Sequence, residues 1–342
     1  MTTKILTYLF LIYTFLVYQS CSKQKETPNP ISPPSTINGK GLSKIEDVLN
    51  GDDQKLIDLL NKVRGSVGKR GLGSKTIWSK KNQYDLGLYI SANHVYNISG
   101  WKSRNAEFFD INKENLGIFE SSQLPPKDGN IILGKTLIAD FPLMHFDISS
   151  SATNSTILPA EDFYFGVFDN QRVEKGMFPQ YPTLIKTDAP LDMYDPHNRT
   201  KLPQTWNIPN KSEIAILVGY PQDETNYPNG AVTTGKILSD EEAKVVIKKL
   251  KEAGDSEGTI AYNSTAEFFI DARGLAGMSG GGAFNSNGQL LGIMVRASDT
   301  ENAPKIIRAV KISHIKSKLT QFYNGLSQDE KDMLKPFLSG EI

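Results

Sequence analysis

Short runs of apolar and alternating residues extend along most of this chain, and Gly, Pro, Asn and Asp separate them. The clearest are DLGLYIS (85–91), NIILGKTLIAD (130–140), DFYFGVF (162–168), EIAILVGYP (213–221), AEFFIDA (266–272) and QLLGIMV (289–295). Apolar runs of this length between turn residues predict β-strands. Strands and helices do not alternate regularly, so the pattern predicts an all-β barrel or sandwich rather than a doubly wound sheet.

Helical spacing marks three other segments. LSKIEDVL and DDQKLIDLLNKV carry apolar residues three and four apart, which predicts an N-terminal helical segment over 42–65. In SDEEAKVVIKKLKEAG, Ser239 stands three residues before Glu242, a capping box that predicts an inserted helix over 239–253. SHIKSKLTQFYNG predicts a terminal helix that Ser313 caps.

The first residues have the pattern of an export signal. MTTK is short and positive, and the apolar run ILTYLFLIYTFLV that follows is shorter than the about 20 residues that span a bilayer. The ending YQSC resembles a bacterial lipoprotein signal in which Cys21 becomes the lipidated first residue, although Tyr18 and Gln19 depart from the usual pattern. We therefore expect a signal peptide over 1–20; a plain secretory signal with a free thiol is the alternative.

A polar, proline-rich stretch follows over 21–41, and its composition predicts a tether rather than a packed core. An acylated Cys21 would anchor the protein to a membrane while the rest of the chain stays in water. Ser22 rather than an acidic residue follows that cysteine, which favours the outer membrane of the cell envelope. The sequence leaves open whether the protein faces the periplasm or the cell surface.

Composition narrows the classes of partner and cofactor. The 342 residues contain 38 Lys and Arg and 38 Asp and Glu, so net charge gives no reason to expect nucleic acid. The single cysteine excludes an internal disulfide and a thiolate zinc site. DMYDPHN (192–198) has the residue types of a cation site, but a solvated acidic loop explains it better. We expect no metal and no organic cofactor.

The candidate chemistry centres on Ser279 in GMSGGGAF. Glycines beside a serine let the backbone turn sharply, so that the N–H groups of Gly277 and Ser279 can hold an oxyanion. A serine hydroxyl also needs a base, and His94 follows the alternating run LYISAN at a strand end.

An orienting carboxylate completes such a site. The candidate is Asp140, which lies between two apolar runs in KTLIADFPLMHFDI. Asp147, Asp162 and Asp169 are nearby alternatives. An ordinary glycine-rich hairpin at Ser279 and a structural histidine at position 94 are the simpler explanations of these motifs.

The order His94, Asp140, Ser279 and the local motifs together resemble the trypsin-like serine peptidases. The resemblance rests on SANHV, on ADFPLM, on GMSGGGAFNSNGQLLGI and on AILVGYP, and it covers about residues 66–322. The serine motif with its following strand is the most specific of these, and the aspartate motif is the weakest.

This resemblance implies two six-stranded antiparallel β-barrels, over about 66–155 and 156–312, with the site in the cleft between them. A terminal helix and a helical tail over 323–342 would follow. The implied reaction is acyl transfer from a peptide bond to Ser279, followed by hydrolysis by water that His94 activates. The implied partner is a protein or peptide substrate.

Two further expectations concern the surroundings of the nucleophile. Met278 stands where many members of the family carry an aspartate that pairs with a freed N-terminal amine, so we expect no activation by N-terminal cleavage. Arg273 is expected to form the floor of the substrate pocket and to favour an acidic side chain. The opposite wall would come from Val295, Arg296 and Ala297. The alternative is that Arg273 faces solvent or pairs with Asp271.

The sequence therefore predicts a membrane-tethered serine endopeptidase. The main alternative is an inactive protein of the same fold that acts as a binding or scaffold lipoprotein. A quality-control protease with appended peptide-binding modules is a weaker alternative.

Overall fold

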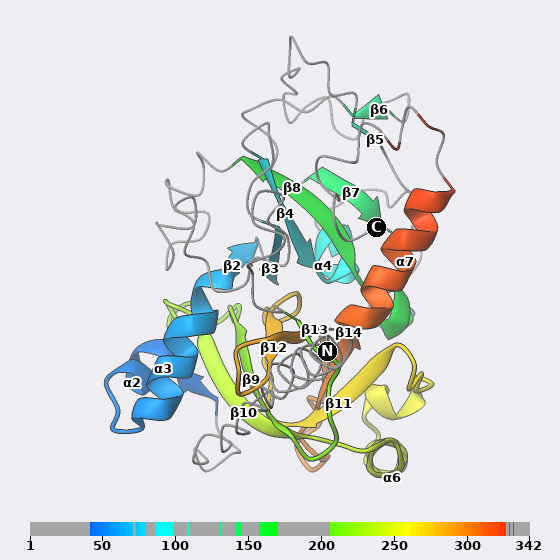
Figure 1. Ribbon diagram of the computed structural model, residues 1–342. Helices are drawn as coiled ribbons and strands as arrows, with labels where there is room; N and C mark the ends of the chain where they lie inside the picture. Colours follow the sequence, from blue (N-terminus) through cyan, green and yellow to red (C-terminus); the bar gives the residue numbers. More distant parts are fainter. Residues whose placement is uncertain are drawn as a thin grey trace, which may run out of the picture. The chain divides into compact units, whose positions relative to one another are not determined.

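The computed structural model describes residues 42–70, 73–79, 86–98, 108–109, 130–131, 141–145, 157–169 and 206–325, together with positions 328 and 331 (Figure 1). The expected signal peptide and tether, and the expected tail apart from its first residues and these two positions, lie outside the described residues.

Six antiparallel strands form a closed barrel in the second half of the chain. Around the barrel the order is β9, β10, β11, β14, β13 and β12, and β12 pairs again with β9. The strands are β9 (Ile214–Gly219), β10 (Ala231–Ile237), β11 (Glu267–Asp271), β12 (Gly282–Phe284), β13 (Leu290–Ala297) and β14 (Ile307–Lys311). A short strand, β1 (Ser43–Lys44), adds to β10.

A second, five-stranded sheet has the order β2-β3-β4-β8-β7. Its strands are β2 (Val67–Arg70), β3 (Gly73–Ser79), β4 (Leu86–Ser91), β7 (Phe141–His145) and β8 (Tyr164–Asp169), and a separate parallel pair joins β5 (Phe108–Phe109) to β6 (Asn130–Ile131).

This sheet includes residues beyond the expected end of the first barrel. Because β8 pairs with β4, the first sheet extends to Asp169 and not to about residue 155. The all-β prediction is confirmed with one closed six-stranded barrel. The five-stranded sheet does not close on itself among the described residues, so a second closed barrel is not established.

Helices lie where the spacing of apolar residues predicted them. The N-terminal segment forms α2 (Ile45–Leu49), α3 (Gln54–Val63) and the 3₁₀ turn η1 (Arg64–Ser66). The inserted helix is α6 (Asp240–Glu252), with both hydrogen bonds of the expected capping box. The terminal helix α7 (Ile312–Asn324) begins two residues early, with Lys311 rather than Ser313 at its N-cap, because it continues directly from β14. Three short elements complete the fold: α4 (Asn93–Ile98), η5 (Pro159–Glu161) and η7 (Ser256–Thr259).

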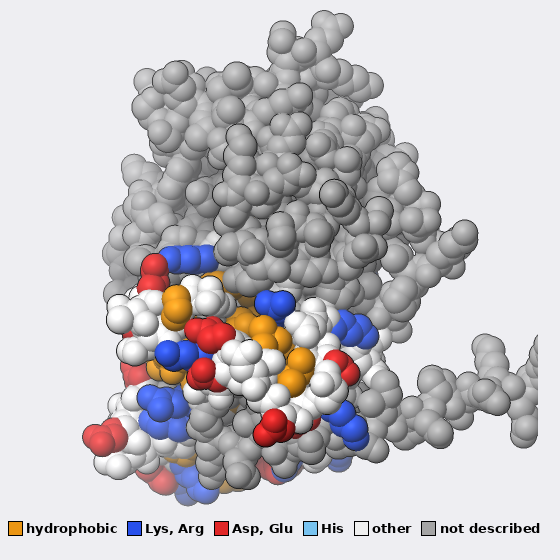
Figure 2. Space-filling view, turned by 90° about the vertical axis from the view of Figure 1, so that its left-hand side faces the viewer, with side chains coloured by type: hydrophobic (Ala, Val, Ile, Leu, Met, Phe, Trp, Pro, Cys, Tyr) orange, Lys and Arg blue, Asp and Glu red, His pale blue; other side chains and the backbone are white. Residues whose placement is uncertain are grey.

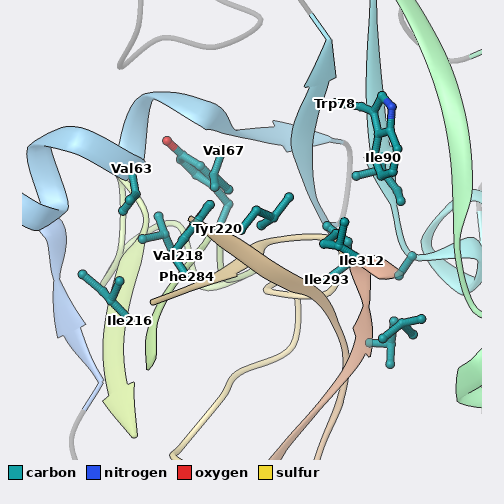
Figure 3. Close-up of a cluster of buried hydrophobic side chains, with 14 of the residues drawn as sticks. Val63, Val67, Trp78, Ile90, Ile216, Val218, Tyr220, Phe284, Ile293 and Ile312 are labelled. Carbon is teal, nitrogen blue, oxygen red and sulfur yellow. The ribbon is translucent and has the colours of Figure 1, made fainter. Parts of the chain in front are cut away.

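One continuous apolar cluster joins these elements (Figure 3). Val63 of the N-terminal helices, Trp78 of the five-stranded sheet, Phe284 of the barrel and Ile312 of α7 are all buried in it. Both sheets and both terminal helical segments therefore share a core, and we conclude that the N-terminal helices are part of the folded unit.

The surface in Figure 2 carries basic and acidic side chains that are interspersed over its described part, in keeping with the equal totals of 38 and 38. Across the described portion of the chain, every helix is too short or too polar to cross a bilayer.

Candidate active site

Strand pairing brings an aspartate to His94. The antiparallel register of β4 and β8 places Ser91 opposite Tyr164 at one edge of the sheet. His94 follows β4 by three residues and Asp162 precedes β8 by two, so both residues emerge at the same edge. The backbone alone therefore brings together two residues that are 68 positions apart.

Asp162 holds His94 at two points. Its Oδ2 lies 2.8 Å from Nδ1 of the ring. Its Oδ1 accepts a 2.9 Å hydrogen bond from the backbone N–H of His94, at the start of α4. A carboxylate in this position satisfies an otherwise unpaired amide at the first turn of the helix and fixes the ring beside it. Asp162 is thus the residue that can orient the base; the sequence offered it only as an alternative to Asp140.

The Asp162 carboxylate is buried and charged. Burial by itself would raise its pKa, but the charges of His94 and Arg296 and the hydrogen bonds from His94 together hold the pKa below its ordinary value of 3.8. The site therefore contains a fixed negative charge next to the imidazole, which stabilises an imidazolium if one forms.

Arg296 also reaches this pair from β13. Its Nη1 bonds to Oδ2 of Asp162 and lies 2.8 Å from Nδ1 of His94. The guanidinium further donates to the carbonyl groups of Val295, at 3.0 Å, and Ile157, at 3.1 Å. These contacts anchor a cation beneath the histidine, an arrangement that the sequence did not predict.

The loop that carries Ser279 is fixed to the five-stranded sheet by Ser74 of β3. The N–H of Ser74 donates to the carbonyl of Ser279 at 2.8 Å, and its hydroxyl donates to the carbonyl of Gly277 at 2.8 Å. The same hydroxyl accepts from the N–H of Tyr220 at 2.7 Å, and Thr76 bonds to the carbonyl of Gly280 at 3.0 Å. These bonds are buried and link the nucleophile loop to the sheet that leads to His94.

Two glycines are required by this geometry. Gly277 has a φ of +96° and Gly280 a φ of +87°, both in the region that side chains disfavour. A Cβ on Gly280 would lie 2.0 Å from the carbonyl oxygen of Ser74, and one on Gly277 would lie 2.5 Å from the nitrogen of Gln222. Glycine therefore allows the loop to turn and also to approach the neighbouring backbone closely.

The amides of Gly277 and Ser279 are both unpaired among the residues that the structure describes, while the amides of Met278, Gly280 and Gly281 all have acceptors. The carbonyl of Ala276 accepts from Gln222, and that of Met278 accepts from Gly281. In a trans peptide the N–H points away from the C=O, so the next amides, of Gly277 and Ser279, point away from those partners. Two amides free to donate, two residues apart on one loop, are the donors that an oxyanion hole requires.

The backbone of Ser279 lies near the histidine segment, but the described residues show no hydrogen bond from its hydroxyl to His94. A Cβ on Gly73 would meet Val95, the neighbour of His94, at 2.5 Å and the carbonyl oxygen of Ser279 at 3.2 Å. The Ser279 hydroxyl has no hydrogen-bond partner among the described residues. The structure therefore shows the pair of His94 with Asp162 and, on a neighbouring loop, Ser279 without a bond to that histidine.

A pocket of about 170 Å³ opens beside Ser279. Its wall is about equally apolar and polar: Leu275, Met294 and Ile307 contribute apolar side chains, and Arg296, Ser298 and Asp299 contribute polar groups. Of the predicted pocket residues, Arg296 and Ala297 line it.

The other two predicted pocket residues lie elsewhere. Arg273 is exposed and is not among the lining residues, as the alternative interpretation had it. Val295 is fully buried in the shared core, whereas its neighbour Met294 belongs to the other apolar cluster. The predicted preference for an acidic side chain thus loses its basis in Arg273.

Met278 stabilises the loop through burial. It is 2% exposed and belongs to an apolar cluster inside the barrel with Leu217 and Phe268. The segment before the nucleophile is thus held by packing, a contact that does not depend on a free N-terminus.

Several predicted positions cannot be compared with the structure. Asp140, Cys21 and the acidic loop over 192–198 lie outside the described residues. Within the described part of the chain, no three His, Cys, Asp or Glu residues gather as ligands for a metal ion.

No protein-family model matches the chain, and a comparison with curated sequences gives no match either. Among solved structures, an inactive serine-to-alanine mutant of Rv3671c from M. tuberculosis H37Rv aligns at 15% identity and a TM-score of 0.36, over 81% of this chain and 97% of the other. The HtrA-type protease AlgW with a decapeptide aligns at 11% identity and a TM-score of 0.39, over 78% and 67%. Similarities this low do not support a conclusion about fold family or function, so the site is interpreted from its own geometry.

Replacing Ser74 tests whether the loop depends on this anchor. Ser74→Ala leaves the N–H of Tyr220 and the carbonyl of Gly277 buried without partners, and we expect the free energy of unfolding to fall by about 1–3 kcal/mol. Denaturant titration measures this loss. Ser66→Ala is the matched control, because the buried Ser66 hydroxyl has no hydrogen-bond partner in the described part of the chain. Equal stability of the two variants would show that the anchor contributes nothing.

Proposed function

We propose that this protein is a serine endopeptidase that works through an acyl-enzyme at Ser279. The observation that carries the proposal is the buried pair of Asp162 with Nδ1 of His94, combined with two unpaired amides at Gly277 and Ser279. Acyl transfer to a serine requires a base that takes its proton, a carboxylate that orients this base, and amides that bind the oxyanion. The adjoining pocket is large enough to receive one substrate side chain.

The steps follow from the positions of the groups. His94 takes the proton of Ser279 at Nε2 as the serine oxygen attacks the peptide carbonyl, and Asp162 stabilises the imidazolium from the other side of the ring. The negative oxygen of the tetrahedral intermediate accepts from the amides of Gly277 and Ser279. His94 then protonates the leaving amine, and a water activated by the same nitrogen releases the acyl group.

A second candidate function is a binding or scaffold protein without turnover. The missing hydrogen bond between Ser279 and His94 favours it. Such bonds are often long or misaligned before substrate binds, so the candidate site retains its functional interpretation.

Covalent labelling of Ser279 separates the two functions. Protein lacking residues 1–21 is incubated with a fluorophosphonate probe, which reacts only with an activated serine. We expect labelling of the unsubstituted protein and none of Ser279→Ala. Equal lack of labelling in both proteins would favour the scaffold.

Two aspartate variants identify the orienting acid. In a Ser/His/Asp site, loss of the carboxylate lowers kcat by about 10⁴-fold because the ring adopts the wrong tautomer. We expect Asp162→Asn to show a loss of this order and Asp140→Asn to keep most of the activity. Rates of hydrolysis of an ester substrate measure both. A severe loss in Asp140→Asn with little change in Asp162→Asn would reverse the assignment.

We also propose that Cys21 carries lipid and tethers the protein to the outer membrane of a bacterial envelope. Support comes from the sequence pattern alone, since these residues are outside the described part. In bacteria that express the full chain, we expect the native protein to sediment with membranes and Cys21→Ser to remain soluble. Membrane association that persists in Cys21→Ser would refute lipid attachment at this residue.

A further inference from the structure

Arg296 occupies an unusual position for a site that must carry a proton. Its Nη1 contacts both Oδ2 of Asp162 and Nδ1 of His94, and these three atoms form a compact triangle. The Arg296 side chain is only 8% exposed, so water screens its charge weakly.

The triangle restricts where the histidine proton can lie. A guanidinium can only donate hydrogen bonds, and a neutral imidazole has one N–H and one lone pair. The 2.8 Å contact from Arg296 to Nδ1 is a hydrogen bond only if Nδ1 holds the lone pair. In that tautomer the 2.8 Å contact between Nδ1 and Oδ2 of Asp162 is not a hydrogen bond but a contact between two acceptors, both of which face Nη1 of Arg296. The proton is then on Nε2, and His94 cannot accept the proton of Ser279.

The alternative tautomer brings two donors together. With the proton on Nδ1, that N–H and the N–H of Arg296 both point at Oδ2 of Asp162 while their nitrogens lie 2.8 Å apart. During acyl transfer His94 becomes a cation, and it would then lie against a second cation. The guanidinium thus opposes the same charge that Asp162 favours.

We propose that Arg296 is a positioning residue that holds His94 in the Nε2–H tautomer, so that the resting site is restrained. This inference rests on the proposed function: Arg296 would limit the activity of the site by setting which nitrogen of His94 carries the proton.

The surroundings of Arg296 allow the guanidinium a second position. Glu257 lies on its other side, with Oε1 3.8 Å from Nε of Arg296. Glu257 is itself buried and bonds to Arg308 at 3.3 Å. A small shift of the guanidinium from Asp162 toward Glu257 keeps the arginine paired and releases Nδ1. Arg296 also lines the pocket, so an occupied pocket contacts the residue that must move.

Replacement of the cation by a neutral amide tests the restraint. We expect Arg296→Gln to react with a fluorophosphonate probe at least about 10-fold faster than the native protein, because Asp162 then holds Nδ1–H without competition. Arg296→Lys keeps a cation and is expected to react more slowly than Arg296→Gln. Arg273→Gln is the matched control, since it removes an exposed arginine outside the pocket and leaves the rate unchanged.

A spectroscopic measurement reads the tautomer directly. The chain has 4 histidines, so ¹⁵N-histidine spectra are simple, and His94→Gln identifies the signals of His94. We expect the native protein to show a lone pair at Nδ1 and Arg296→Gln to show Nδ1–H. A proton on Nδ1 in the native protein overturns the proposal, as does an Arg296→Gln variant that folds and reacts no faster.

The two readouts separate failure of this proposal from failure of the proposed function. If Arg296→Gln does not fold, the native spectrum alone decides. If no folded variant reacts with the probe while the spectra show the expected tautomers, the restraint stands and the hydrolase assignment fails.

Discussion

The pairing of Asp162 with His94 is the contact on which the candidate site depends. It follows from the register of two antiparallel strands, because β4 ends just before the histidine and β8 begins just after the aspartate. The carboxylate is buried, so its charge acts at close range and is compensated by the histidine and by Arg296. A shift of that register by one residue would turn the side chains of the strand to the opposite face and separate the pair.

A second set of buried contacts joins this pair to the nucleophile. Ser74 of β3 bonds to the loop at Gly277 and Ser279, and Tyr220 next to β9 bonds to the same serine. Buried polar groups are costly when unpaired, so these bonds fix one arrangement of the loop. The shared apolar core then holds the two sheets together around it. The chemistry proposed for Ser279 is therefore a consequence of how the two sheets meet.

The sequence predicted much of the barrel and only part of the site. Apolar runs revealed β4, β8, β9, β11 and β13, and the capping box placed α6 within a residue. The sequence did not predict β10 (AVTTGKI), because its buried residues Thr233 and Thr234 are polar and interrupt the run of apolar residues. The sequence did identify His94 and Ser279. The histidine follows a predicted strand directly, and the serine lies among glycines, and both local patterns can be recognised without the fold.

The choice of aspartate shows why the rest could not be predicted. Asp140 and Asp162 each precede a strand with an aromatic residue, and local sequence does not distinguish them. Only the pairing of β8 with β4 does so, and that is a long-range contact. The same reasoning holds for Arg296, whose flexible side chain reaches a partner 134 residues away. A signal is present, since the sequence predicts a strand over DFYFGVF with Asp162 at its start.

The most direct measurement is a crystal structure of the protein with a phosphonate bonded to Ser279. Our account predicts that one phosphonyl oxygen accepts from the amides of both Gly277 and Ser279. It also predicts that Nε2 of His94 bonds to the adduct while Asp162 remains on Nδ1. An adduct whose oxygen points away from these amides, or a histidine ring that leaves Asp162, would contradict the account.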